Sequence, residues 1–143
     1  MEIIRATTTA GQAGAYYVRI QAMARKHQIP LEVEFDEHDT PETKSIVMVD
    51  DYLPIATCRL YAIDDVKVML GRIVVLPEYR RQGIGTRVVE EAEAWVRELG
   101  FVVAEVESRE NKIPFYESMG YMADFSHKIE GATFTCYKMR KKL

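Results

Sequence analysis

Residues 72–86 read RIVVLPEYRRQGIGT, and the fold can be worked out from this stretch. It opens with Ile73-Val74-Val75, a β-branched run that is typical of a buried strand. Pro77 ends that strand, because proline has no N–H for a ladder and restricts the residue before it. A basic turn closed by Gly83 and Gly85 follows. Apolar residues then recur at the spacing of a helix, namely Ile84, Val88, Val89, Ala92, Val96 and Leu99.

The turn between this strand and this helix favours an anion. A helix start has unpaired N–H groups and the positive end of the helix dipole. Glycines let a phosphate approach the backbone, and Arg80 and Arg81 add cationic, fork-shaped donors. Two other phosphate loops are excluded. No Lys-Ser or Lys-Thr pair follows the glycines, as a P-loop requires, and Val88 stands where a dinucleotide fingerprint needs a glycine.

Length and composition indicate a single domain spanning residues 1–143, with 48% apolar and 29% charged residues. The formal net charge of −3 argues against general binding of nucleic acid. No apolar run is long enough to cross a membrane, and the N-terminus lacks a signal-peptide pattern. Cys58 and Cys136 have neither metal nor redox spacing, so we expect free thiols in a reducing cytoplasm.

The N-terminal segments read as a strand and a long helix. Glu2–Ala6 is expected to be the strand, and Thr7–Thr9 offers a cap for a helix that runs to about His27. The expected apolar positions of the helix are Ala13, Tyr16, Tyr17, Ile20, Met23 and Ala24. The residues expected on its exposed side are Arg19, Arg25 and Lys26.

The segment from Ile29 to Asp39 is crowded with carboxylates. One interpretation is a solvated acidic loop that Leu31, Val33 and Phe35 fasten to the core. A second is an acidic rim that attracts a cationic amine by focusing the electric field. A third is a metal site at His38 and its acidic neighbours, although no fixed ligand spacing supports it.

Three strands joined by tight turns come next, over residues 44–49, 55–63 and 66–75. Such short connections predict an antiparallel meander. Arg59 and Arg72 are charged positions within these otherwise apolar strands. We expect each to be ion-paired or exposed on one face of the sheet, and not to bind a substrate.

The pattern after the central helix predicts a parallel pair of strands. Gly100 can end the helix in a left-handed conformation, and residues 101–108 read as a further strand. Strand, helix and strand in this order imply a right-handed crossover between parallel neighbours. Glu105 and Glu107 share one face of the new strand, because side chains alternate.

A short helix that ends at Gly120 follows, with Asn111 as its expected cap and Pro114 in its first turn. The remaining segments are expected to be a hairpin of residues 121–128 and 132–139 and a solvated basic tail of residues 138–142.

Two motifs in this order resemble a known family. Arg80-x-x-Gly83-x-Gly85 resembles the acyl-CoA signature of the GNAT N-acetyltransferases, [QR]-x-x-G-x-[GA]. Asn111-x-x-x-Phe115-Tyr116-x-x-x-Gly120-Tyr121 resembles N-x-x-x-x-F-Y-x-x-x-G-F at the other end of that domain, with one residue fewer after the asparagine. One helix and one strand separate the motifs, as in the family. The chain therefore looks like a small bacterial, single-domain GNAT protein.

The resemblance implies an α/β (α+β) fold with a mixed central sheet of about six to seven strands. The antiparallel meander would form its N-terminal part, and helices would flank the sheet. The parallel pair of strands would splay apart at the acetyl-CoA site.

The resemblance also implies acetyl-CoA as cosubstrate and no metal. The pantetheine amides would pair with the strand backbone, and the pyrophosphate would bind backbone N–H groups of the glycine turn. Strand amides would also polarise the thioester carbonyl, as an oxyanion hole does. The residues implied in cosubstrate binding are Ile73, Val74, Val75, Arg80, Arg81, Gln82, Gly83, Ile84, Gly85, Thr86, Asn111 and Tyr116.

Tyr116 matches the family's tyrosine and is expected to be the general acid that protonates the leaving CoA thiolate. The alternative is an ordinary hydrogen-bonded core tyrosine. An alkyl amine, with a pKa of about 10.4 for a lysine-like group, must lose a proton to react. Two carboxylates are candidate bases: Glu34 in the acidic segment, and Glu107 near the carboxyl end of its strand.

The predicted function is acetyl transfer to a primary amine of a small molecule or peptide by direct attack. A non-catalytic acyl-CoA-binding sensor or partner-binding module is the alternative, and transfer of another acyl group is a third interpretation. The expected partners are the amine and, in a homodimer, a second copy, with no nucleic acid and no membrane.

We predict that Gly83→Asp and Gly85→Asp each abolish CoA binding. An aspartate at either position would place a carboxylate where the phosphates are expected to lie. Calorimetric titration with CoA measures this. Unchanged affinity in both variants would place the ligand elsewhere on the protein.

Overall fold

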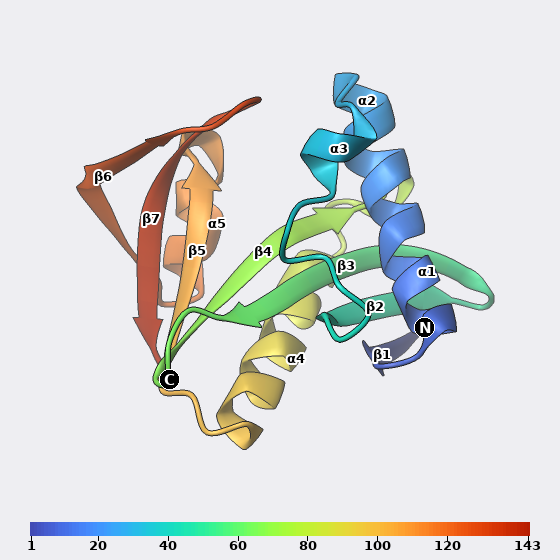
Figure 1. The fold of residues 1–143 in the computed structure, drawn as a ribbon, viewed down its shortest axis with the longest axis horizontal. Helices are drawn as coiled ribbons and strands as arrows, with labels where there is room; N and C mark the ends of the chain where they lie inside the picture. The colour runs from blue at the N-terminus through green and yellow to red at the C-terminus, as the bar shows by residue number, and fades with distance from the viewer.

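One mixed sheet carries helices on both of its faces (Figure 1). The computed structural model describes residues 1–143. The strands are β1 Glu2–Ala6, β2 Lys44–Asp50, β3 Leu53–Ala62, β4 Lys67–Val75, β5 Val103–Arg109, β6 Met122–Glu130 and β7 Thr135–Lys142. The α-helices are α1 Thr9–Arg19, α2 Arg25–His27, α3 Leu31–Glu34, α4 Ile84–Glu98 and α5 Ile113–Ser118. A π-helical turn, η1 Ile20–Ala24, joins α1 to α2, and two 3₁₀ turns are η2 Pro77–Tyr79 and η3 Glu110–Lys112.

The seven strands lie in the order β1-β2-β3-β4-β5-β7-β6. Strands β1 to β4 form the predicted antiparallel meander, and β4 and β5 are the predicted parallel pair. The last hairpin returns beside β5, with β7 as the inner strand. The predicted mixed sheet with flanking helices is therefore confirmed. Individual bounds shift by a few residues, and β5 begins at Val103 instead of residue 101.

Helix α4 covers one face of the sheet and buries most of the predicted apolar stripe, including Val88, Val89 and Ala92. Glu93 lies on the predicted polar side but is only 3% exposed. The Tyr121 hydroxyl donates to its carboxylate at 2.7 Å and Lys141 Nζ at 3.0 Å, so its charge is compensated inside the fold. None of the helices is long and apolar enough to cross a membrane.

Helix α1 covers the other face, and the predicted apolar side is only partly correct: Ala24 is buried as predicted, and Tyr16, Ile20 and Met23 are half-buried. Ala13 and Tyr17 are exposed. The buried positions are mostly small, namely Gly11, Gly14, Ala15, Val18 and Ala22. A Cβ added to Gly11 would lie 2.8 Å from the Cβ of Ala6, so a side chain there would clash. Small residues let the helix approach the sheet closely. A search for large apolar residues at helical spacing overlooks such positions.

An ionic cluster fastens α1 and α3 to the sheet, and we call it the arginine–carboxylate cluster. Its members are Arg19, Arg59, Arg72, Glu34, Asp36 and Asp39. Arg19 was expected on the exposed side of its helix, but it is 1% exposed. Its guanidinium donates to both carboxylate oxygens of Asp39, at 2.7 and 2.9 Å, and to Glu34 Oε2 at 3.0 Å.

The cluster overturns both main interpretations of residues 29–39. Glu34, Asp36 and Asp39 neither face solvent as a loop nor form an open acidic rim, because arginines from α1, β3 and β4 bind them. The chain also forms the short helix α3. Leu31 and Val33 are exposed, which leaves Phe35 as the anchoring side chain.

The ionic role of two strand arginines is confirmed, because Arg59 and Arg72 are both ion-paired within this cluster. The expected solvated tail is wrong. Residues 138–142 belong to β7, and Lys138 and Arg140 flank the buried carboxylate of Glu105.

We predict that the cluster makes stability depend on pH in the acid range. Burial alone raises the pKa of Asp36 and Asp39, but hydrogen bonds and charges from Arg59 on Asp36 and from Arg19 on Asp39 outweigh it, so both pKa values are lowered. The unfolded chain therefore takes up protons first, and the stabilisation is present above about pH 4 and lost below it. Urea midpoints measured from pH 7 down to pH 3 test this.

Asp39→Asn should lower the free energy of unfolding at pH 7 by about 3 kcal/mol, because it removes one of the two counter-charges of each of the buried guanidiniums of Arg19 and Arg59. It should also flatten the acid dependence. Glu37→Gln is the matched control, since Glu37 lies in the same segment with its side chain 82% exposed. Parallel acid curves for Asp39→Asn and the wild type would contradict the assignment.

Candidate active site

The parallel strands β4 and β5 separate partway along their length. Their pairing ends at Met69 and Glu105, although β4 continues to Val75 and β5 to Arg109 (Figure 1). Beyond this point the edge of β4 that faces β5 has no strand partner. The structure therefore opens a gap in the sheet where the family resemblance implied a splayed pair.

A bulge in β4 accompanies the separation. Thr57 pairs with Val74 and Arg59 with Gly71, so two residues of β4 lie opposite one residue of β3. The bulged residue Arg72 has φ +48°, a left-handed conformation that is uncommon for a side-chain-bearing residue. Bulges bend a strand and leave backbone groups unpaired, which accounts for the departure of β4 from β5.

The glycine turn leads from the end of β4 into α4. Arg81 and Gly83 have positive φ, +63° and +74°, and Gly83 caps the helix without a side-chain hydrogen bond. The first intrahelical bond is donated by Arg87 N to Gly83 O. The backbone N–H groups from Arg81 to Thr86 donate no hydrogen bond within the protein. Unbonded donors at a helix N-terminus form a site for an anion.

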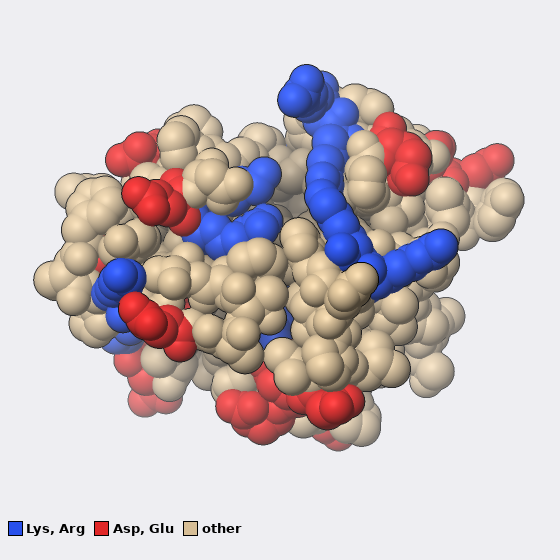
Figure 2. All heavy atoms as spheres, turned by 90° about the horizontal axis from the view of Figure 1, so that it is seen from above, with Lys and Arg blue, Asp and Glu red and all other residues tan.

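Unpaired cations from four parts of the chain surround this turn. Lys26, Arg80, Arg109 and Lys112 take part in no ion pair. They lie close enough to affect one another, since the pKa of Lys112 is lowered by burial and then by the charges of Arg109, Arg80 and Lys26. The pKa of His27 is lowered in the same way, by burial and then by Arg109, Lys26 and Arg80. Figure 2 shows Lys and Arg side chains along the middle of this face and Asp and Glu mostly at its margin.

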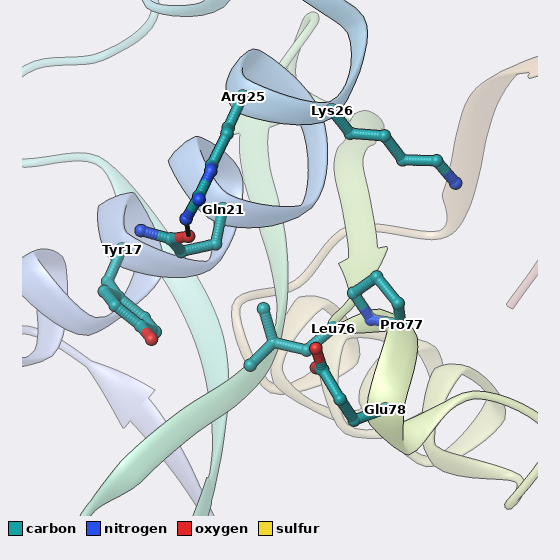
Figure 3. Close-up of a pocket in the computed structure, with 7 residues that line it drawn as sticks. All are labelled: Tyr17, Gln21, Arg25, Lys26, Leu76, Pro77 and Glu78. Carbon is teal, nitrogen blue, oxygen red and sulfur yellow. Dashed lines mark hydrogen bonds between the residues drawn. The ribbon is translucent and has the colours of Figure 1, made fainter.

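A pocket of about 480 Å³ lies beside the turn, between η1 and the end of β4 (Figure 3). Arg25 and Gln21, which are joined by a hydrogen bond of 3.1 Å, face Leu76 and Glu78 across it. Lys26 extends over Pro77 at its border. Arg25 and Lys26, which line the pocket, extend the cationic surface onto α2.

Tyr116 lies on α5 next to the gap. Its side chain is buried, with 8% exposed, and its hydroxyl makes no hydrogen bond within the protein. Burial raises its pKa, and the neighbouring Cys58 raises it further, so the phenol is protonated at neutral pH. The hydroxyl oxygen is not among the buried atoms without a partner, so it stays accessible from outside the core, unlike the hydroxyl of Tyr121, which donates to Glu93.

The expected capping role of Asn111 is wrong. Asn111 lies in the turn η3, and the N-cap of α5 is Lys112, which makes no side-chain cap bond. Pro114 in the first turn and Gly120 at the end, with φ +97°, are as predicted. The turn places Lys112 and Asn111 directly after the open end of β5.

The two candidate bases have different surroundings. Glu34 is 3% exposed, and its carboxylate binds Arg19 and Arg72. Glu107 is exposed on β5 and takes part in no ion pair. It lies near Tyr61, whose pKa is raised by burial and, among the carboxylates, most by Glu107.

Lys26, Arg109 and Lys112 had no place in the sequence-based site. They come from α2, β5 and η3, and no motif marks any of them. Only the fold brings them to the glycine turn. The signal available in the sequence was weak: Lys26 and Lys112 have no acidic residue three or four positions away, but Arg109 has Glu105.

Comparisons with known proteins agree with this geometry. Residues 13–121 match the family model described as the acetyltransferase (GNAT) family. An uncharacterized acetyltransferase of Streptococcus pyogenes is 30% identical over 110 residues, which cover 77% of this chain and 75% of that protein. A crystal structure of a protein described as an N-acetyltransferase, from Lactobacillus plantarum, superposes with a TM-score of 0.92 at 29% identity, over 99% of this chain and 97% of that one. A family acetyltransferase of Elizabethkingia anophelis with acetyl-CoA bound shares the fold, with a TM-score of 0.68 at 15% identity over 99% and 98% of the two chains.

We predict that Lys112→Ala weakens CoA binding about 3- to 10-fold at low salt, because a charge-assisted contact to phosphate is lost. The salt dependence of binding should become shallower. Lys142→Ala is the matched control, since Lys142 pairs with Val103 at the far end of β5. Calorimetric titration at two salt concentrations measures both effects. Equal losses in the two variants would mean that only overall charge matters.

Proposed function

The chain belongs to the GNAT acetyltransferase family, and we propose that it is an N-acetyltransferase that moves an acetyl group from acetyl-CoA to a primary amine. The observation that carries this proposal is the run of unbonded backbone N–H groups from Arg81 to Thr86, beside the gap between β4 and β5. Such donors with unpaired cations around them suit a pyrophosphate. A cosubstrate held there by its phosphates can extend into the gap.

The cosubstrate is proposed to bind along β4 and at the glycine turn. Acetyl-CoA supplies an acyl group that is already activated as a thioester. The unpaired edge of β4 around Ile73–Val75 is suited to the pantetheine amides, because free backbone groups seek partners. Arg80 and Lys112 supply charge to the phosphates, and Asn111 lies beside Lys112. Backbone N–H groups at the β4 bulge polarise the thioester carbonyl.

The proposed reaction is a direct attack. The amine nitrogen forms a bond to the thioester carbon, the carbon–sulfur bond breaks, and the sulfur leaves as a thiolate. Tyr116 donates its phenolic proton to that sulfur and regains a proton from solvent, a role that its hydroxyl favours because it is protonated and makes no hydrogen bond within the protein. The proton lost by the amine goes to a base and then to solvent.

Glu107 is the better-placed candidate for that base. It is an unpaired carboxylate on β5, the strand that borders the gap. The carboxylate of Glu34 is held by Arg19 at 3.0 Å and by Arg72 at 3.2 Å, which leaves it little capacity to bind an ammonium group. The acceptor is proposed to be an amine of a small molecule or a peptide. A cytoplasmic location and a homodimer stay predictions from the sequence.

The function is tested by thiol release from acetyl-CoA against a panel of amines, with CoA binding measured by calorimetry on the same sample. Release with one class of amine would support the proposal and identify the acceptor class. Tight CoA binding without release from any amine would favour an acyl-CoA sensor. Absence of binding would overturn the proposed site at the glycine turn.

We predict that Tyr116→Phe lowers kcat about 100-fold, because the leaving thiolate loses its proton donor. The affinity for CoA should change by less than about twofold, since the hydroxyl contributes no phosphate contact. Tyr52→Phe, which removes an exposed hydroxyl in the turn between β2 and β3, is the control. An unchanged kcat across pH in Tyr116→Phe would remove this residue from the mechanism.

A further inference from the structure

The bulge in β4 is held in place by groups outside the sheet, the backbone oxygen of Glu34 and the carboxylate of Asp36. Arg72, the bulged residue with φ +48°, donates from Nη2 and Nε to the backbone oxygen of Glu34, at 2.9 and 3.1 Å. Its Nη2 also donates to Asp36 Oδ2 at 3.2 Å. A left-handed conformation at an arginine is strained and persists only where surrounding contacts impose it. The contacts here come from Glu34, the last residue of α3, and from Asp36 just after it.

Asp36 binds both sides of the bulge. Its Oδ1 accepts from Arg59 Nη1 at 2.7 Å, and its Oδ2 accepts from Arg59 Nη2 and from Arg72 Nη2, each at 3.2 Å. Arg59 lies on β3, where it pairs with Gly71 at the base of the bulge. One carboxylate therefore ties the bulged residue of β4 to the neighbouring strand.

The Asp36 carboxylate is itself fixed. The backbone N–H of His38 donates to Asp36 Oδ1, and the backbone N–H of Asp36 donates to Asp39, each at 3.0 Å. Asp39 is in turn bound by Arg19 of α1. The bulge is thus connected through hydrogen-bonded groups to the helix that covers the sheet.

The bulge lies where the chemistry is expected. It follows Met69, the last residue of β4 that pairs with β5, and therefore belongs to the part of the strand that borders the gap. Cys58 of β3 lies opposite the bulge and is close enough to Tyr116 to raise the pKa of its phenol. The candidate acid on α5 and the bulged backbone of β4 are thus both close to Cys58.

We propose that Asp36 is a positioning residue, which acts through Arg72 to hold the β4 bulge so that its backbone N–H groups point at the thioester carbonyl of acetyl-CoA. This inference rests on the proposed acetyltransferase function. Asp36 touches neither the reacting atoms nor the phosphates. Its loss should leave CoA binding intact and weaken only the contacts made to the acetyl group.

The test compares Asp36→Asn with the wild type. Asparagine keeps the shape of the side chain but removes the charge that binds the two arginines. The Asp36 side chain is 25% exposed, so the substitution can be tolerated better than one at Asp39, which is 6% exposed. Glu37→Gln, in the same segment, is the matched control for removing one negative charge.

Two measurements need no known acceptor. Calorimetry gives the dissociation constants of CoA and acetyl-CoA, and their ratio reports contacts to the acetyl group. The ¹³C resonance of acetyl-CoA labelled at the carbonyl carbon reports polarisation, because hydrogen bonding to the oxygen moves it downfield. We expect Asp36→Asn to lower the preference for acetyl-CoA over CoA about 3- to 10-fold, to shift the bound resonance toward that of free acetyl-CoA, and to leave the CoA constant unchanged.

Arg72→Gly is the second variant, because glycine adopts φ +48° without strain but lacks the tether. It should show the same loss as Asp36→Asn, and the double variant should be no worse than Arg72→Gly alone. An unchanged preference and resonance in Asp36→Asn would overturn the proposal. Equal weakening of CoA and acetyl-CoA would also overturn it, since the role would then be structural.

Failure of the underlying function has a different result. A wild type that binds no CoA would overturn the acetyltransferase proposal and this inference with it. A wild type that binds CoA but shows neither a preference for acetyl-CoA nor a shifted carbonyl resonance would overturn only the role assigned to the bulge.

Discussion

The separation of β4 from β5 is the constraint on which the rest of the structure depends. A parallel pair that continued to Val75 would use up the backbone groups that a pantetheine arm needs and would close the gap beside Tyr116. The bulge at Arg72 prevents this. A left-handed arginine costs about 1–2 kcal/mol, while hydrogen bonds to charged groups contribute about 1.5–3 kcal/mol each. The contacts of Arg72 with the backbone oxygen of Glu34 and with Asp36 therefore offset the strain.

The arginine–carboxylate cluster contributes more to fixing the relative positions of the elements than to stability. Replacing a buried ion pair by apolar residues is often neutral, whereas breaking one is costly. A cluster in which each carboxylate is bound by two arginines or more therefore fixes one arrangement of α1, α3, β3 and β4. Where β4 and β5 still pair, Glu93 joins α4 to Tyr121 and to Lys141 of β7. Buried charges with partners thus lie beside both the separated and the paired parts of β4 and β5.

The charges of the chain are sorted between two environments. Arginines of the cluster are neutralised by carboxylates inside the fold, while Lys26, Arg80, Arg109 and Lys112 have none. A chain with a net charge of −3 thereby presents a cationic surface at the mouth of the gap (Figure 2). Net charge is a poor guide to what such a protein binds. The local sum around a site decides that, because screening in water limits charge interactions to about 8–10 Å.

The resemblance to the GNAT family indicated Tyr116 as the candidate acid, and the sequence by itself determined the order of the elements and the glycine turn at the start of α4. These follow from local rules, since strand, turn and helix signals lie within a few residues of one another. It did not determine that Arg19 is buried, that Glu34 is occupied by arginines, or that Lys26 and Lys112 approach the turn. Periodicity can indicate which side of a helix is apolar, but the pairing of a charge depends on residues distant in the chain. Only the tertiary structure decided which charges are compensated, and hence which remain free for a ligand.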